Sequence, residues 1–207
     1  MALRIYGNRA LKTVPGQQTR PTTGRVREAL FNIWQGQVAG CRWLDLCAGN
    51  GVMGAEALCR QASAVVGIER SGLACRTIRQ NWAHVAQANQ RYDVLQGDVV
   101  AQLPRLAGQA FDRIYFDPPY HSGLYEPVLQ AIATHHLLAP TGEMAVEYTE
   151  AAWQPIAIAG LQWIESRRYG HTSLAFYRPV APDDAAMDKG AVDNRAIVPF
   201  DDVTPPL

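Results

Sequence analysis

The sequence predicts an α/β fold with a mostly parallel central sheet, helices on both faces and an antiparallel hairpin at one edge. Short apolar runs alternate with helix-like segments between about residues 41 and 148, a pattern typical of a parallel sheet covered on both faces. A glycine-rich turn, "LDLCAGNGVMG", follows the first of these runs. Two adjacent apolar runs then close the pattern as a hairpin. The prediction is therefore one doubly wound domain with an edge hairpin.

Residues 1–36 are predicted to form a small hairpin and a helix ahead of this domain. The runs "LRIY" and "ALKTV" are separated by Gly7-Asn8, which favours a tight turn. After the loop "PGQQTRP", Thr22 or Thr23 can cap a helix over about 25–34. The apolar residues of this helix recur on one face, so the helix is expected to pack on the domain.

Residues 37–180 contain the alternating unit. Seven strands are expected at 41–46, 64–69, 92–96, 112–116, 143–148, 161–170 and 172–180. Helices are expected between them at 53–61, 72–88, 99–106 and 126–138. The last two strands form the antiparallel edge hairpin.

Composition limits the classes of protein that the chain can belong to. Its 207 residues are 48% hydrophobic and 18% charged, which is typical of a globular protein. It has no apolar run long enough to span a membrane and no signal-peptide core. Its four cysteines form no C-x-x-C pair, so reduced thiols are expected, without a disulfide or a metal site. We predict a cytoplasmic monomer with no membrane partner.

Charge is unevenly distributed along a chain whose net charge is zero. Residues 181–207 hold six acids and two bases, a net charge of −4, and are predicted to be a mostly disordered acidic tail. Residues 1–27 hold six bases and no acid: Arg4, Arg9, Lys12, Arg20, Arg25 and Arg27. This cluster is a candidate phosphate-binding surface, with a solvated basic face as an equal alternative. Arg167 and Arg168 are the next candidates.

The glycine turn indicates a ligand-binding loop. Gly49, Gly51 and Gly54 form the pattern G-x-G-x-x-G where a strand passes into a helix. Glycines let a backbone approach a ligand, and a helix start offers free N–H groups. A dinucleotide site is a competing interpretation, because Glu69 ends the next strand where a ribose-binding acid belongs. A purely structural turn is the other alternative.

Asp45 favours a cationic ligand over a dinucleotide. It ends the first strand of the alternating unit, where a carboxylate would repel a pyrophosphate and attract a cation. S-adenosylmethionine carries a sulfonium and an ammonium group and no phosphate. Glu69 would then bind the ribose hydroxyls, and Asp98 the adenine amino group. Asp98 has a structural alternative, because it can instead cap the short helix that follows it.

The stretch "FDPPY" at 116–120 indicates methyl transfer to an amine. An exocyclic amine on a base is planar and a poor nucleophile, and acceptors aimed at its N–H groups would localise the lone pair and stabilise the developing charge. Asp117 and the Pro118 carbonyl can supply two acceptors, held rigidly by the prolines. Tyr120 offers a ring on which an unstacked base can lie. The predicted catalytic residues are Asp117, Pro118 and Tyr120.

These motifs resemble those of the RsmD family, bacterial methyltransferases of guanine N2 in 16S ribosomal RNA. The resemblance covers about residues 3–180 and rests on "RPTTGRVREALFN", "LDLCAGNGVMGAEAL", Glu69 and "YFDPPY". Asn50 departs from the family, which usually has Ser or Thr there. Variable substrate contacts are expected at His121-Ser122. The resemblance implies a Rossmann-like, seven-stranded class I S-adenosylmethionine-dependent methyltransferase fold.

The resemblance also implies a substrate and a set of contacts. The expected partner is 16S rRNA or a small-subunit assembly intermediate, and the expected target is guanine 966. The segment that includes Arg20 would help to enclose the methionine end of the cofactor. The predicted cofactor contacts are Thr22, Thr23, Asp45, Ala48, Gly49, Asn50, Gly51, Glu69, Arg70, Asp98, Val99 and Asp117.

Three alternatives remain open from the sequence. DNA adenine-N6 methylation shares the signature, but the chain has no room for a separate target-recognition domain. A cofactor-free RNA-binding module would leave the glycine turn and the strand-end acids unexplained. A nicotinamide oxidoreductase is disfavoured by Asp45.

Overall fold

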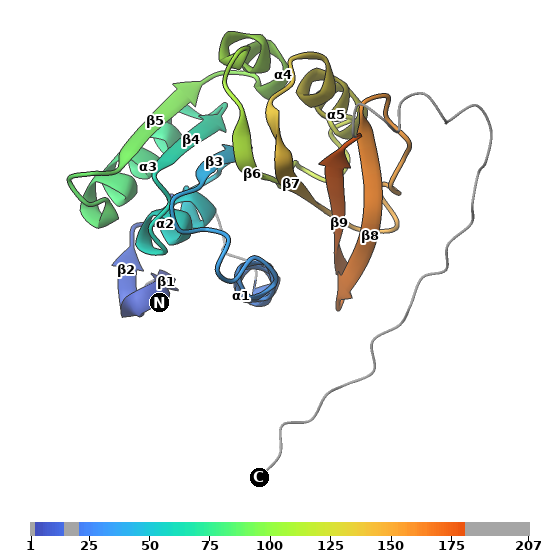
Figure 1. Cartoon of the computed structure of the whole chain (residues 1–207). Coiled ribbons are helices and arrows are strands. Elements are labelled where there is room, and N and C mark those ends of the chain that lie inside the picture. The colour runs from blue at the N-terminus through green and yellow to red at the C-terminus, as the bar shows by residue number, and fades with distance from the viewer. Residues whose placement is uncertain (1–2, 15–20, 181–207) are drawn as a thin grey trace.

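The computed structural model describes residues 3–14 and 21–180, and places them in a seven-stranded sheet and a separate two-stranded hairpin. The hairpin pairs β1 with β2, and the large sheet has the order β5-β4-β3-β6-β7-β9-β8 (Figure 1). The strands are β1 Leu3–Ile5, β2 Arg9–Leu11, β3 Arg42–Leu46, β4 Ala64–Glu69, β5 Arg91–Gln96, β6 Phe111–Phe116, β7 Leu138–Tyr148, β8 Leu161–Tyr169 and β9 Thr172–Pro179.

The five strands from β5 to β7 are parallel, while β9 and β8 add antiparallel pairs at one edge. The helices are α1 Pro21–Ile33, α2 Val52–Cys59, α3 Gly72–Val85, α4 Val99–Gln102 and α5 Tyr125–Thr134, with short 3-10 turns at Tyr6–Asn8 and Leu103–Leu106. This arrangement confirms the predicted α/β class. In the described ranges each helix is too short or too polar to span a bilayer.

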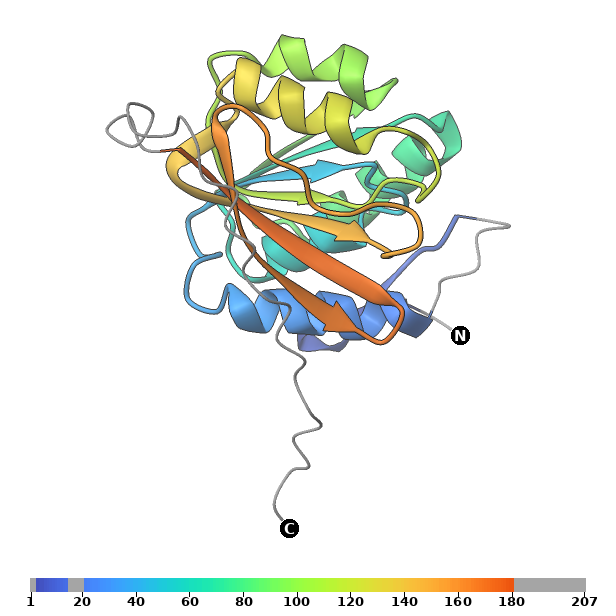
Figure 2. The ribbon, with the colours of Figure 1, turned by 90° about the vertical axis from the view of Figure 1, so that its right-hand side faces the viewer.

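Helices cover both faces of the large sheet, as Figure 2 shows edge-on. Alternate strand residues point to opposite faces and separate the buried apolar side chains into two clusters. One cluster joins Trp43 and Val65 to α1, α2 and α3. The other joins Leu44 and Ile114 to α4 and α5. Both faces are therefore buried, as expected for a parallel sheet.

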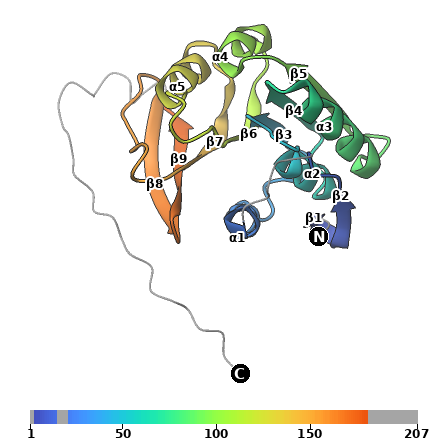
Figure 3. The ribbon, with the colours of Figure 1, turned by 180° about the vertical axis from the view of Figure 1, so that it is seen from behind.

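The N-terminal hairpin and α1 share a core with the sheet. Ile5 and Leu11 belong to the same buried cluster as Trp43, and Figure 3 shows the hairpin beside α2. Buried Glu56 fixes this contact, since its carboxylate accepts from the Tyr6 amide at 3.1 Å and pairs with Arg27 at 3.4 Å. Residues 3–14 and 21–36 therefore pack as part of one unit with the rest of the domain.

Several helix bounds differ from the sequence-based prediction. The first helix begins at Pro21, because a proline with fixed φ suits the first helical position. Thr22 and Thr23 therefore belong to its first turn and do not precede the helix. The expected helix 72–88 ends at Val85, and the Gln90 side chain then bonds the Leu58 and Ala62 carbonyls. The expected helix 126–138 ends at Thr134.

The shorter last helix and the longer strand after it have one cause. His136 adopts a left-handed φ of 50°, which ends the helical path. Leu138 then pairs with Phe111 in the sheet, so β7 starts five residues earlier than its apolar run predicted. The predicted acidic tail at 181–207 lies outside the described residues.

Candidate active site

Polar side chains line up across the carboxyl ends of four neighbouring parallel strands. Leu46 pairs with both Ile68 and Phe116, and Phe116 pairs with Val146. The residues that follow these pairs on β4, β3, β6 and β7 are Glu69, Cys47, Asp117 and Glu147, which we call the strand-end row. Glu69 and Asp117 lie close enough to Cys47 to raise the pKa of its thiol. This edge of a doubly wound sheet is where ligands bind.

The glycine turn is tied to the acids on either side of it. The Glu69 carboxylate accepts from the Gly49 amide at 2.9 Å and from the Ser71 amide at 2.7 Å. The Asp45 carboxylate accepts from the Gly54 amide at 3.0 Å. Asp45 is 1% exposed, so it lies beneath the turn and fixes the start of α2.

The three glycines of the turn serve two purposes. A Cβ on Gly54 would lie 2.3 Å from the Trp82 ring, and a Cβ on Gly51 would lie 2.9 Å from Trp82 and Ile78. Both are therefore needed for packing against α3. At Gly49 a Cβ would meet nothing within 4 Å, so the backbone here faces open space. Gly49 also has a positive φ of 58°, which favours glycine.

The carboxylates of Glu69, Asp117 and Asp98 make this edge of the sheet electronegative. The pKa of the Cys47 thiol is raised to about 12, mainly by burial and also by the nearby acids Glu69, Asp117, Asp45 and Asp98. Burial also raises the pKa of Asp45 to about 8, against the Gly54 amide, which lowers it, while Glu69 adds to the rise. Such a region favours a cation over a pyrophosphate.

The predicted adenine contact, Asp98, is exposed and caps α4. Its carboxylate accepts from the Ala101 amide at 3.1 Å, so the capping alternative describes its local structure. Val99 behind it is buried and Arg70 is exposed. Ala48 is buried and Asn50 half-buried within the turn. Their contacts with a cofactor remain predictions, and the side chains of Thr22 and Thr23 lie outside the described residues.

The "DPPY" segment forms a closed turn next to the glycine turn. The Asp117 amide donates to the Leu46 carbonyl at 3.4 Å, and the Ser122 amide donates to the Pro119 carbonyl at 2.9 Å. Pro118 is buried and Asp117 is half-buried. The structure thus places the predicted catalytic acid between β3, which leads into the glycine turn, and β7.

Glu147 is a site residue that the sequence analysis missed. It is 3% exposed, and its carboxylate accepts from the Tyr115 hydroxyl and, at 3.2 Å, from the Tyr120 hydroxyl. The Tyr120 hydroxyl also lies 3.4 Å from Thr172 Oγ1. Its sequence signal was available, because Glu147 is the penultimate residue of the apolar run "EMAVEY", as Asp45 is of its own strand. Glu147 therefore ties the predicted base-stacking ring to β7.

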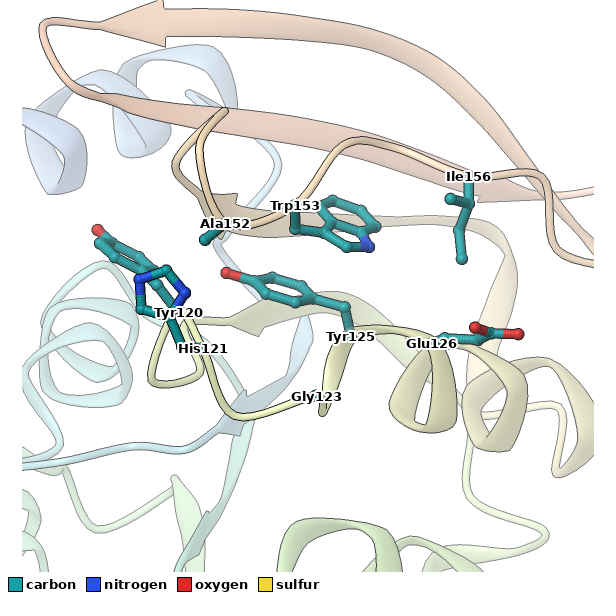
Figure 4. Close-up of a pocket in the computed structure, with 8 residues that line it drawn as sticks. All are labelled: Tyr120, His121, Gly123, Tyr125, Glu126, Ala152, Trp153 and Ile156. Carbon is teal, nitrogen blue, oxygen red and sulfur yellow. The ribbon is translucent and has the colours of Figure 1, made fainter.

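A cavity of about 450 Å³ opens beside Tyr120 (Figure 4). We call it the Trp153 cavity, and it lies between the turn after β6 and the segment joining β7 to β8. Its lining residues are Tyr120, His121, Gly123, Tyr125, Glu126, Ala152, Trp153 and Ile156. The size is within the usual range of small-molecule sites.

The predicted RNA contacts in the N-terminal segment divide by exposure. Arg27 is 7% exposed and paired with Glu56, and this burial removes it from the set. Arg9 is exposed overall, but its guanidinium donates inward to Cys59 Sγ at 3.2 Å and to the Val85 carbonyl at 3.3 Å. Arg25 is exposed, and Arg20 lies outside the described residues.

Four other predicted RNA contacts are exposed and engaged with neighbours. Arg4 donates to Asn8, and Lys12 donates to the Gln80 side chain at 3.0 Å. At the opposite end of the domain, Arg167 pairs with Glu165 at 2.6 Å and Arg168 with Glu150 at 3.7 Å. Exposed pairs of this kind are weak, so these cations can exchange their partners for phosphates.

The fold and this site define a class I S-adenosylmethionine-dependent methyltransferase. "Putative methyltransferase yhhF from Escherichia coli" is a solved structure with a TM-score of 0.74 and 28% sequence identity, covering 87% of this chain and 99% of that one. The sequence model described as "Conserved hypothetical protein 95" matches residues 3–178. The chain therefore belongs to this family, the RsmD family.

Curated relatives agree with this assignment. "Putative rRNA methyltransferase YlbH" of Bacillus subtilis (strain 168) is 31% identical over 172 residues, which cover 82% of this chain and 93% of that protein. "Ribosomal RNA small subunit methyltransferase D" of Escherichia coli (strain K12) is 27% identical over 190 residues, which cover 90% and 94% of the two chains. Both matches span nearly the whole of the relative.

Proposed function

We propose that this chain transfers a methyl group from S-adenosylmethionine to the exocyclic N2 amine of a guanine in 16S ribosomal RNA. The observation that carries the proposal is the strand-end row. In this row Asp117, the proposed acceptor for the amine, lies between Cys47, which leads into the glycine turn, and Glu147, which accepts from the Tyr120 hydroxyl. A cofactor site and a base site therefore meet at one carboxylate.

The residues of the glycine turn fit this cofactor. Gly49 faces open space, so a ligand can approach the backbone there. Glu69 uses one lone pair of each oxygen for backbone amides and retains capacity for the ribose hydroxyls. Asp98 would accept from the adenine amine, and the surrounding carboxylates would balance a sulfonium and an ammonium group. When bound, the cofactor supplies an electrophilic methyl group.

Asp117 would act on the amine of the base. As the nitrogen forms its bond to the methyl carbon, positive charge grows on the nitrogen, and a carboxylate acceptor at its N–H stabilises that charge. The same oxygen can take the proton that the methylated amine must lose. The Pro118 carbonyl would bind the second N–H, while the Tyr120 ring, held by Glu147, would support the base by stacking.

Ribosomal RNA as the substrate is supported by the names of the relatives, and guanine N2 by the family resemblance. That resemblance gives guanine 966 as the expected nucleotide. Exposed Arg4, Lys12 and Arg25 would contact the phosphate backbone of 16S rRNA or of a small-subunit assembly intermediate. We expect the chain to act as a monomer.

Methyl incorporation tests this proposal. Purified protein is incubated with labelled S-adenosylmethionine and either small-subunit RNA or duplex DNA of equal length. Incorporation into RNA alone is expected, with strong loss in Asp117→Ala and none in Asp93→Ala, an exposed aspartate on β5. Label in DNA alone, or equal loss in both variants, would contradict the proposal.

A further inference from the structure

The Trp153 cavity has a rigid aromatic wall. The Tyr125 and Trp153 rings stack at 4.5 Å with an interplanar angle of 8°, and Tyr148 meets Trp153 edge-on at 5.2 Å. Figure 4 shows the stacked pair in the middle of the lining residues, with Tyr120 and His121 on one side and Glu126 and Ile156 on the other. Trp153 remains half-buried rather than buried, so part of its surface faces the cavity.

The segment that carries Trp153 is fixed at several points. The Ala152 and Trp153 amides both donate to the Thr149 carbonyl, at 2.9 and 3.1 Å. At Ile156 the backbone amide and carbonyl each bond the Tyr177 hydroxyl at 3.2 Å. Tyr125, whose ring stacks on Trp153, is held in turn by its hydroxyl, which donates to the Glu147 carbonyl at 3.2 Å. The cavity is therefore formed in advance of any ligand, which reduces the entropy lost on binding.

The chemistry of the lining favours a flat, uncharged, polar-edged ligand. Tyr120 and Trp153, both half-buried, offer aromatic surface, while His121 and Glu126, both exposed, offer a hydrogen-bonding edge. The lining residues include a carboxylate and no lysine or arginine, so a phosphate would be disfavoured. Nucleobases have this combination of a π-face and polar edges, and aromatic side chains bind unstacked bases in RNA.

We propose that the Trp153 cavity binds the base of a nucleotide next to the methylated guanine. Tyr120 lines the cavity, but Asp117 does not. A base enclosed there would hold its amine away from Asp117. It would still contact the ring of Tyr120, which belongs to the catalytic turn. The occupant is therefore a neighbour of the target base. This inference rests on the proposed function, since it assigns a second base of the same RNA.

A filling substitution with a matched control tests the cavity. Ala152 lines it, while the adjacent Ala151 is exposed and does not. Ala152→Leu and Ala151→Leu are compared for single-turnover methylation of an RNA fragment and for S-adenosylmethionine affinity by calorimetry. Stacking of one base corresponds to a roughly 5- to 150-fold effect. We expect Ala152→Leu to raise the half-saturating RNA concentration by about tenfold, with an unchanged rate at saturation, unchanged cofactor affinity and no effect of Ala151→Leu.

Abasic substrates connect the effect to a base. Fragments that lack the base on the 5′ or the 3′ side of the target are tested with the wild type and with Ala152→Leu. One of them should weaken RNA binding to the wild type by a similar factor and leave binding to Ala152→Leu unchanged. Equal behaviour of both alanine variants, or independent effects of the abasic site and of Ala152→Leu, would overturn the inference. A wild type that methylates no RNA would instead refute the proposed function itself.

Discussion

Asp45 should make the stability of the protein depend on pH. Its carboxyl group is 1% exposed and accepts from the Gly54 amide at 3.0 Å, and burial raises its pKa from 3.8 to about 8. The unfolded chain releases this proton near pH 4, while the folded chain keeps it until about pH 8. Between these values the folded state binds more protons, so the free energy of unfolding falls as pH rises.

The size of this effect follows from the linkage relation. A carboxyl group that is protonated only in the folded state changes the free energy of unfolding by about 1.4 kcal/mol per pH unit. From pH 5.5 to 7.5 the contribution of Asp45 is therefore at most about 3 kcal/mol, and we expect a loss of about 1–3 kcal/mol. Asp45→Asn keeps a carbonyl acceptor for Gly54 but has no proton to release, so it should lack this contribution.

Urea denaturation of the cofactor-free protein at pH 5.5 and 7.5 measures the difference. The wild type should lose about 1–3 kcal/mol more than Asp45→Asn over this range. Asp45→Ala, which removes the acceptor of the Gly54 amide, should be less stable than Asp45→Asn at both pH values and also lack the pH-dependent loss. Equal losses in the wild type and Asp45→Asn would show that Asp45 is not neutral in the folded state, and would refute this reasoning.

Three further predictions concern catalysis and RNA binding. Asp117→Ala should lower the single-turnover rate by about 10²–10³ with little change of cofactor affinity in calorimetry, and Asp117→Asn should retain some activity. A wild-type rate in Asp117→Ala would exclude the proposed role. Tyr120→Ala should weaken RNA binding by about 1–3 kcal/mol. Tyr120→Phe should keep stacking but lose about 1 kcal/mol of folding stability, because Glu147 loses a hydrogen-bond donor. Equal weakening of RNA binding by both substitutions would favour the hydroxyl over stacking. Replacing Arg4 and Lys12 by Gln should reduce the salt dependence of RNA affinity by about 1.4, two contacts' worth for single-stranded RNA, and an unchanged slope would place the RNA surface elsewhere.

Local sequence patterns predicted those parts of the fold that depend on local physics. The strand at 64–69 has the same bounds in the prediction and in the structure, since its apolar run is bounded by polar residues. The glycine turn and the "DPPY" turn were visible because glycine and proline restrict the backbone in known ways. The alternation of strands and helices predicted a parallel sheet. Both turns follow strands of that sheet, so they were expected at the same edge, where all parallel strands end.

Features that depend on distant partners were missed. Glu147 becomes a site residue only through the register that places it beside Asp117 and through the hydroxyls of Tyr115 and Tyr120. Arg27 was predicted as a phosphate contact from its place in the basic cluster, but in the structure it is buried and paired with Glu56. These contacts join residues that are far apart in the sequence. A single sequence does not reveal the strand register or the side-chain pairs that bring them together.

The most direct test of the central claim is the identity of the methylated nucleoside. Small ribosomal subunits and free 16S rRNA from cells lacking this gene are treated with the purified protein and S-adenosylmethionine. The RNA is then digested and its modified nucleosides are identified and mapped by mass spectrometry. The account predicts one new N2-methylguanosine at a single position, absent with Asp117→Ala. A new N6-methyladenosine, or no new methylated nucleoside in either substrate, would contradict it.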